Sequence, residues 1–145
     1  MVDLRQLQEE YHQVTEDKLT IGALVETVLG EEDGLILSGL RKQRTKKMVV
    51  VGIDKDEALC FGSVLVNSLM NPRSEYSDEY LQAQYLIKKE NYPDFLEYDS
   101  YVDCAILFSI PVQKLLRGKY FGILNDDDRR GIFEVLETTE TLTTK

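Results

Sequence analysis

The feature that most constrains the fold is a pair of β-type runs joined by a short polar segment. Residues 48–53 and 58–66 are rich in β-branched and other apolar residues. Asp54, Lys55, Asp56 and Glu57 lie between them, and four polar residues are a suitable connection for a hairpin. The sequence therefore predicts that these two runs pair as an antiparallel hairpin.

Further β-type runs lie on both sides of this hairpin. The expected strands are 21–29, 80–88, 100–110 and 119–124, with a short extended piece at 35–40. The segment 80–88 also fits a short helix, because its alternation of apolar and polar residues is weak. Five or six short strands with helices at the ends predict a mostly β fold, built as a small, strongly bent sheet or barrel rather than a parallel α/β fold.

Helices are expected near both ends of the chain. Residues 2–14 have a helical period, with Leu4, Leu7, Tyr11 and Val14 on one stripe. The residues 125–137 form the clearest helix, because Asn125 or Asp126 can cap its N-terminus. Its expected buried stripe is Ile132, Phe133 and Leu136. A helical turn at 111–116 begins at Pro111. The stretch 1–145 is expected to be a single domain, with an appended helix at 1–17, a sheet or barrel with its terminal helix at 20–137 and a frayed tail at 138–145.

The composition excludes several classes of protein. A hydrophobic content of 43% supports a folded core, while 26 acidic against 17 basic residues give a net charge of −9. This charge argues against broad coating of nucleic acids, so no DNA partner is expected. No apolar run approaches the ~20 residues of a membrane helix, and no secretory segment opens the chain. Cys60 and Cys104 are isolated and are interpreted as reduced core thiols of a cytoplasmic protein, with a disulfide as the alternative.

Most catalytic signatures are missing from the sequence. His12 is the one histidine and lies in the expected N-terminal helix, so a triad that needs histidine is poorly supported. There is no phosphate-binding loop and no zinc motif. The acidic clusters at 31–33 and 126–128 lack the alternating spacing of a calcium loop. No metal and no cofactor is therefore predicted.

One cluster of positive charge contrasts with the acidic whole. Its five cations are Arg41, Lys42, Arg44, Lys46 and Lys47, and they are expected to form a loop before the strand at 48–53. Such a cluster can bind an anion locally, and the alternative is a solvated strand end. In a hairpin, its last two lysines would lie near Asn67 and Ser68, and a cation beside an amide or hydroxyl can hold a phosphate. Asp99 and Ser100 begin a later strand and add a polar pair.

Four stretches resemble the MazF/PemK family of toxins from toxin–antitoxin systems. They are K-K-M-V-V-V-G at 46–52, V-L-V-N-S at 64–68, D-S-Y-V-D-C at 99–104 and L-L-R-G-K-Y-F-G-I-L-N-D-D-D at 115–128. The resemblance covers the residues 46–136, about two-thirds of the chain. It implies a small SH3-like β-barrel closed by a C-terminal helix, a homodimer, an antitoxin protein as partner, and cleavage of single-stranded RNA without a metal.

The resemblance also implies a set of site residues. Family members have an arginine followed by a proline where this chain has Lys46 and Lys47, and a threonine or serine where it has Asn67 or Ser68. Lysine lacks the planar fork of arginine, so this departure matters at a phosphate. The expected catalytic residues are Arg44, Lys46 and Ser68, and the expected RNA-binding residues are Arg41, Lys42, Lys47, Asn67 and Ser100. The alternative is a non-catalytic barrel that serves as a protein-interaction module, which the altered basic position and the net charge favour.

Overall fold

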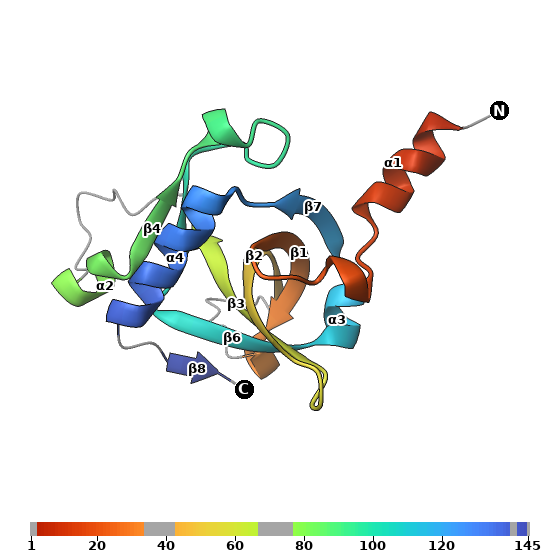
Figure 1. Ribbon diagram of the computed structural model, residues 1–145. Coiled ribbons are helices and arrows are strands. Elements are labelled where there is room, and N and C mark those ends of the chain that lie inside the picture. Colours follow the sequence, from red (N-terminus) through yellow and green to blue (C-terminus); the bar gives the residue numbers. More distant parts are fainter. Residues whose placement is uncertain (1–2, 34–42, 67–76, 140–141, 145) are drawn as a thin grey trace.

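The computed structural model describes residues 3–33, 43–66, 77–139 and 142–144 and shows a mostly β fold (Figure 1). The strands are β1 (Ala23–Gly30), β2 (Gln43–Asp54), β3 (Leu59–Val66), β4 (Gln84–Ile87), β5 (Ser100–Asp103), β6 (Ile106–Pro111), β7 (Lys119–Ile123) and β8 (Leu142–Thr144). The helices are α1 (Leu4–His12), α2 (Asp78–Gln82), α3 (Val112–Leu116) and α4 (Asp126–Thr138). Three 3-10 turns complete the described elements: η1 (Glu16–Lys18), η2 (Glu31–Asp33) and η3 (Lys89–Asn91).

The strands form one sheet in the order β4-β5-β3-β2-β1-β7. The predicted hairpin is confirmed, because β2 and β3 pair antiparallel from Met48 opposite Val64 to Asp54 opposite Leu59. The other edge of β3 is shared between two strands: its first half pairs with β6 and its end pairs with β5. The sheet bends strongly where the partner of β3 changes from β6 to β5. At this end of β3, the strands β2 and β5 move apart.

The expectation of a closed barrel is wrong for the described strands, which form an open sheet. Within these residues no ladder joins β7 back to β4 or to β6. The space between the outer strands is filled instead by α4, which lies across the sheet in Figure 1 and inserts Ile132 into the core. A terminal helix thus closes this side of the molecule, where a barrel would need another ladder.

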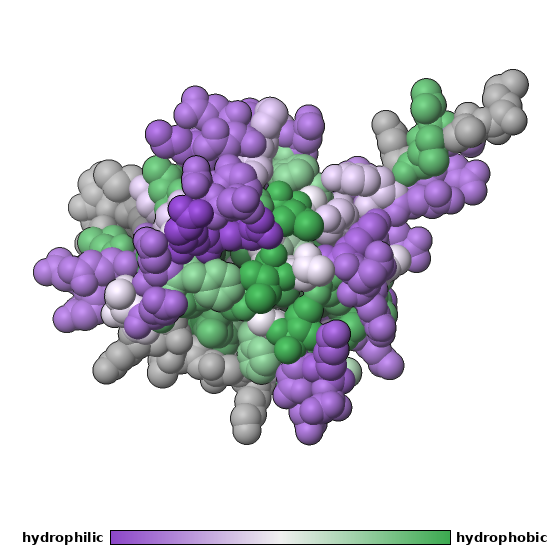
Figure 2. Space-filling model, viewed as in Figure 1, coloured by the Kyte–Doolittle hydropathy of each residue, from purple (hydrophilic) through white to green (hydrophobic). Residues whose placement is uncertain are grey.

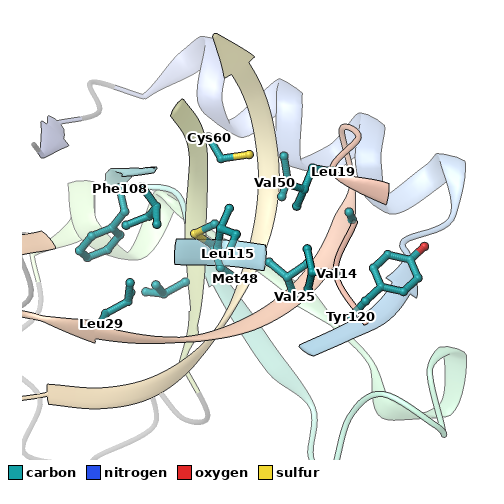
Figure 3. Close-up of a cluster of buried hydrophobic side chains, with 13 residues drawn as sticks. Val14, Leu19, Val25, Leu29, Met48, Val50, Cys60, Phe108, Leu115 and Tyr120 are labelled. Carbon is teal, nitrogen blue, oxygen red and sulfur yellow. The ribbon is translucent and has the colours of Figure 1, made fainter. Parts of the chain in front are cut away.

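The first hydrophobic cluster lies on one face of the sheet, and Figure 3 shows its side chains converging from several elements. Its buried members are Val14, Leu19, Ala23, Val25, Leu29, Met48, Val50, Cys60, Val64, Phe108, Ile110, Leu115 and Tyr120. Alternate residues of β1 and β2 belong to it, as expected for strands whose side chains point alternately to two faces. Helix α3 contributes Leu115, which is fully buried.

The second hydrophobic cluster lies on the opposite face, under α4. Its buried members are Leu24, Val49, Leu65, Ile87, Tyr92, Leu96, Val102, Cys104, Phe121, Leu124 and Ile132. Both cysteines are buried and free, which confirms the interpretation of Cys60 and Cys104 as core thiols. Burial raises the pKa of the Cys60 thiol to about 11, and burial together with the neighbouring Asp103 raises that of Cys104 to about 12. Neither thiol is a reactive nucleophile at neutral pH.

Helix α4 is held at its first turn. The Asn125 side chain, one of the two predicted caps, caps the helix by accepting a hydrogen bond of 2.8 Å from the amide of Asp128. The Asp128 carboxylate in turn accepts hydrogen bonds from the hydroxyls of Tyr85 and Tyr92. A Cβ atom at Gly131 would lie 2.2 Å from the Tyr85 ring, so only glycine lets the helix pack this closely.

Helix α1 stands off from the rest of the molecule, as the expected appended helix does (Figure 1). It is anchored at its C-terminal end. Lys18 donates hydrogen bonds to the backbone oxygens of Glu10, Tyr11 and Gln13 at 3.1, 2.8 and 2.9 Å. The His12 Nδ1 atom lies 2.8 Å from the backbone oxygen of Tyr120. None of the described helices is long and apolar enough to cross a membrane.

Several local expectations differ from the structure. The segment 80–88 is divided between α2 and β4, and 100–110 forms two strands because the Asp103 carboxylate accepts a hydrogen bond of 3.0 Å from the amide of Ala105 and starts a turn. The tail was expected to fray, but its residues Leu142–Thr144 form β8, which pairs with β6 in parallel. The extended piece expected at 35–40 lies outside the described residues.

Candidate functional site

A cleft of about 580 Å³ opens where β3 leaves β2. Met48 is the last residue of β2 toward this end that pairs with β3, and the following residues of β3, Leu65 and Val66, pair with β5 instead. The two strands therefore diverge at this end of the hairpin. The lining residues are Glu26, Arg44, Thr45, Lys46, Lys47, Leu65, Val66, Leu96, Glu97, Tyr98 and Ser100.

The basic wall of the cleft is a strand. The expectation of a loop is wrong for residues 43–47, which belong to β2 and pair with β1. Arg44 lies opposite Leu29, Lys46 opposite Thr27 and Lys47 opposite Glu26. Since side chains alternate along a strand, Arg44 and Lys46 share one face of β2 and Lys47 lies on the other. Pairing with β1 fixes the backbone of the basic residues, which a loop would not do.

Lys46 is half-buried beside a second cation. Burial lowers the pKa of its ammonium, and the nearby Arg44 lowers it further. Within the part of the chain that the structure describes, no carboxylate lies within ion-pair distance of Lys46. The folded protein thus holds a partly desolvated positive charge that an anion entering the cleft could compensate.

Lys47 has a different role, because its ammonium binds the segment 95–100, which forms the wall of the cleft opposite β2. Its Nζ atom donates a hydrogen bond of 3.1 Å to the backbone oxygen of Phe95 and lies 5.1 Å from the centre of the Phe121 ring. The Phe95 ring packs against Gly122, where a Cβ atom would lie 2.2 Å from it. Gly122 has a φ of +145°, which favours glycine. Lys47 therefore joins β2 to the segment 95–100, while Arg44 and Lys46 line the cleft from the other face of β2.

The opposite wall is the segment 95–100, which is anchored at several points. Leu96 is buried in the second hydrophobic cluster. The Asp99 carboxylate accepts a hydrogen bond of 2.8 Å from the amide of Lys89. The Ser100 hydroxyl is buried and donates a hydrogen bond of 3.0 Å to the backbone oxygen of Tyr98. Ser100 therefore lines the cleft mainly as a support of this wall, since its proton is already used.

The structure brings together four of the predicted site residues and does not test the other four. Arg44, Lys46, Lys47 and Ser100 line one cleft, although more than fifty residues separate the β2 residues from Ser100. The remaining four, Arg41, Lys42, Asn67 and Ser68, lie outside the described residues.

Sequence reasoning missed three other residues of the cleft, namely Glu26, Glu97 and Tyr98. Glu26 is the single charged residue of β1, and a charge in an otherwise uncharged strand was the available signal. Glu97 and Tyr98 immediately precede the Asp99-Ser100 pair. The carboxylates of Glu26 and Glu97 reduce the positive charge of the cleft, so it fits one phosphate group better than a continuous polyanion.

Other sites offer less chemistry. His12 lies on α1 and does not line the cleft. Over the described ranges, no group of three histidine, cysteine or carboxylate side chains is placed to hold a metal ion. A second cavity of about 670 Å³ is lined mainly by apolar side chains such as Ile21, Ile53 and Val112, and it contains no cluster of cations.

Comparison with known proteins adds no assignment: no family model matches the chain, and no curated protein matches it.

Proposed function

We propose that the chain is a MazF/PemK-like protein that binds single-stranded RNA in this cleft and cuts it without a metal. The proposed fold is an open variant of the family's SH3-like barrel. The observation that carries the proposal is that Arg44, Lys46 and Ser100 line one cleft, in which the Lys46 ammonium is partly desolvated. Two adjacent cations on one strand face match the two negative charges of the pentacoordinate phosphorane that forms during cleavage.

The proposed reaction uses the RNA itself as nucleophile. The ribose 2′-oxygen attacks the adjacent phosphorus, the bond from phosphorus to the 5′-oxygen breaks, and the products carry a 2′,3′-cyclic phosphate and a 5′-hydroxyl. Arg44 and Lys46 would stabilise the negative charge that develops on the pentacoordinate phosphorus. Lys46 is also a candidate for the acid that protonates the leaving oxygen, because burial and the nearby Arg44 lower its pKa and make its proton easier to transfer. The carboxylates of Glu26 and Glu97 line the cleft and are candidates for accepting the 2′-proton.

The direct test is incubation of the purified protein with a varied panel of single-stranded RNAs in the presence of EDTA. Cleavage with 2′,3′-cyclic phosphate ends is expected, since two fixed cations provide the positive charge of the proposed site. Affinity should also decrease as salt rises, with a shallow dependence set by the few phosphates engaged. The proposal is wrong if the protein neither binds nor cuts any RNA of the panel at low salt.

A second candidate function is a non-catalytic module that binds protein. The observation that favours it is the apolar stripe of α1, where Leu4, Leu7 and Tyr11 are 75%, 47% and 50% exposed. Figure 2 shows hydrophobic surface, in green, on the helix that stands off from the body. Exposed apolar patches of this kind mark interaction surfaces. The antitoxin partner implied by the resemblance stays a prediction, because no described surface identifies it.

We assign the α1 stripe to a second copy of this chain, which gives the proposed homodimer an interface. If two α1 helices pair antiparallel, Leu4 of one copy meets Tyr11 of the other. Pairing of the two stripes would remove their exposed apolar side chains from water under twofold symmetry. Light scattering at micromolar concentration should give a dimer mass for the natural protein and a monomer mass for Leu7→Lys. The control Leu81→Lys, at an exposed position on α2, should stay dimeric. A monomer of the natural protein across this range would contradict the assignment.

A further inference from the structure

Tyr98 is an exposed aromatic side chain at the mouth of the cleft. It is 61% exposed, and it is the exposed large hydrophobic residue that lines the basic cleft in the described part of the chain. The other exposed residues of this kind, such as Leu81 and Leu86, lie on elements away from the cleft. A single exposed aromatic needs no explanation by itself, so its position in the same cleft as Arg44 and Lys46, on the opposite wall, is the informative fact.

The backbone on both sides of Tyr98 is fixed while its ring stays in solvent. Leu96 is buried before it, the Asp99 carboxylate binds the Lys89 amide after it, and the Tyr98 carbonyl accepts the Ser100 hydroxyl. Further back, Phe95 stacks on Tyr92 with ring centres 5.8 Å apart. Because these contacts hold the backbone of the segment 95–100, a movement of the loop cannot bring the Tyr98 ring into the core. The ring is therefore presented on a rigid support, which lowers the entropic cost of binding a ligand.

We propose that Tyr98 is a stacking platform for one unpaired base of the RNA, next to the phosphate that Arg44 and Lys46 hold. This inference rests on the proposed function and specifies how the site selects its substrate. An unpaired base offers a free aromatic face, and stacking of a base on an aromatic side chain is tolerant of base identity. In a duplex the faces of the bases are already stacked, so a double strand can use only the phosphate contact. The cleft should therefore distinguish single strands from duplexes through Tyr98.

The test uses short oligonucleotides that the protein can bind but cannot cut. A fluorescein-labelled hexamer with 2′-O-methyl sugars supplies phosphates and bases, and a matched hexamer with two central abasic positions supplies the phosphates alone. Fluorescence anisotropy gives the dissociation constant of each for the natural protein, Tyr98→Ala, Tyr98→Phe and the control Leu81→Ala. Circular dichroism and thermal melting establish that each variant is folded.

Tyr98→Ala should weaken binding of the complete hexamer by about 5- to 100-fold, the range expected for one base stacked on an aromatic ring. Its affinity for the abasic hexamer should change less than about twofold, because that ligand has no base to stack. Tyr98→Phe should keep the affinity for both, since a phenyl ring also stacks, and Leu81→Ala should behave like the natural protein.

Two results would overturn the stacking role while leaving the proposed function intact. In the first, Tyr98→Ala weakens both hexamers equally, which means that the side chain only shapes the cleft. In the second, the natural protein binds the abasic hexamer or a duplex as tightly as the complete single strand. If the natural protein binds neither hexamer at low salt, the proposed function itself fails and the stacking role fails with it.

Discussion

Lys46→Met is expected to reduce RNA cleavage by about 10²- to 10³-fold, or ~2.7–4 kcal/mol, the usual cost of losing one group that stabilises charge in the transition state. The same change should leave the melting temperature equal or higher. Burial and Arg44 lower the pKa of Lys46, so folding favours its neutral form, and a protonated Lys46 lowers the free energy of unfolding at neutral pH. Methionine removes that charge and keeps an unbranched side chain of similar length.

Single-turnover cleavage and thermal melting of the same preparations would measure both effects. Lys55→Met, in the exposed turn between β2 and β3, is the matched control and should change neither quantity. If Lys46 is the acid, the rate of the natural protein should also fall at alkaline pH, at a value below the ordinary lysine pKa of 10.5. A variant that is less stable yet fully active would show that Lys46 is a structural residue.

Ile132→Ala is expected to lower the free energy of unfolding by about 2–5 kcal/mol, because it removes buried methyl groups and leaves a cavity. Ile132 is 1% exposed and lies in the second hydrophobic cluster. Phe133→Ala should cost less than half as much, although it removes a larger side chain, since Phe133 is only half-buried. Urea denaturation of the two variants, analysed with a common slope, would compare them directly.

The comparison of these two neighbours tests the orientation of α4. The sequence predicts Ile132, Phe133 and Leu136 as a buried stripe, and only Ile132 is fully buried in the structure. One residue along a helix is a rotation of about 100°. A larger loss for Phe133→Ala than for Ile132→Ala would therefore place a different face of α4 on the sheet.

The parts of the fold that the sequence predicted are those determined by local pattern. The hairpin of β2 and β3 follows from two β-type runs with a short polar connection, and α4 follows from its cap at Asn125. The break between β5 and β6 could not be seen, because the Asp103 side chain makes the turn while the apolar alternation continues across it. The basic strand 43–47 was also missed, since it contains no apolar residue and depends on pairing with β1.

The candidate site was predictable in its chemistry and less so in its geometry. The charge cluster and the resemblance indicated Arg44, Lys46 and Ser100, which the structure brings to one cleft. The different roles of Lys46 and Lys47 could not be predicted, because they depend on which face of β2 each side chain occupies. Lys47 reaches the backbone of Phe95, a residue far away in sequence. Tyr98 was missed for the same reason, since its exposure depends on anchors contributed by other segments.

The dependence of the cleft on β7 has a consequence for synthesis of the protein. β1 pairs with β7 about a hundred residues later in the chain, and the wall at Phe95 packs on Gly122 of that strand. As the chain leaves the ribosome, the basic strand emerges first, but the opposite wall lacks its contact with Gly122 until β7 follows. Long-range pairing of this kind forms late in folding. The cleft would therefore be incomplete while the chain is attached to the ribosome, and the proposed RNA cleavage would begin only after the chain has left the messenger RNA that encodes it.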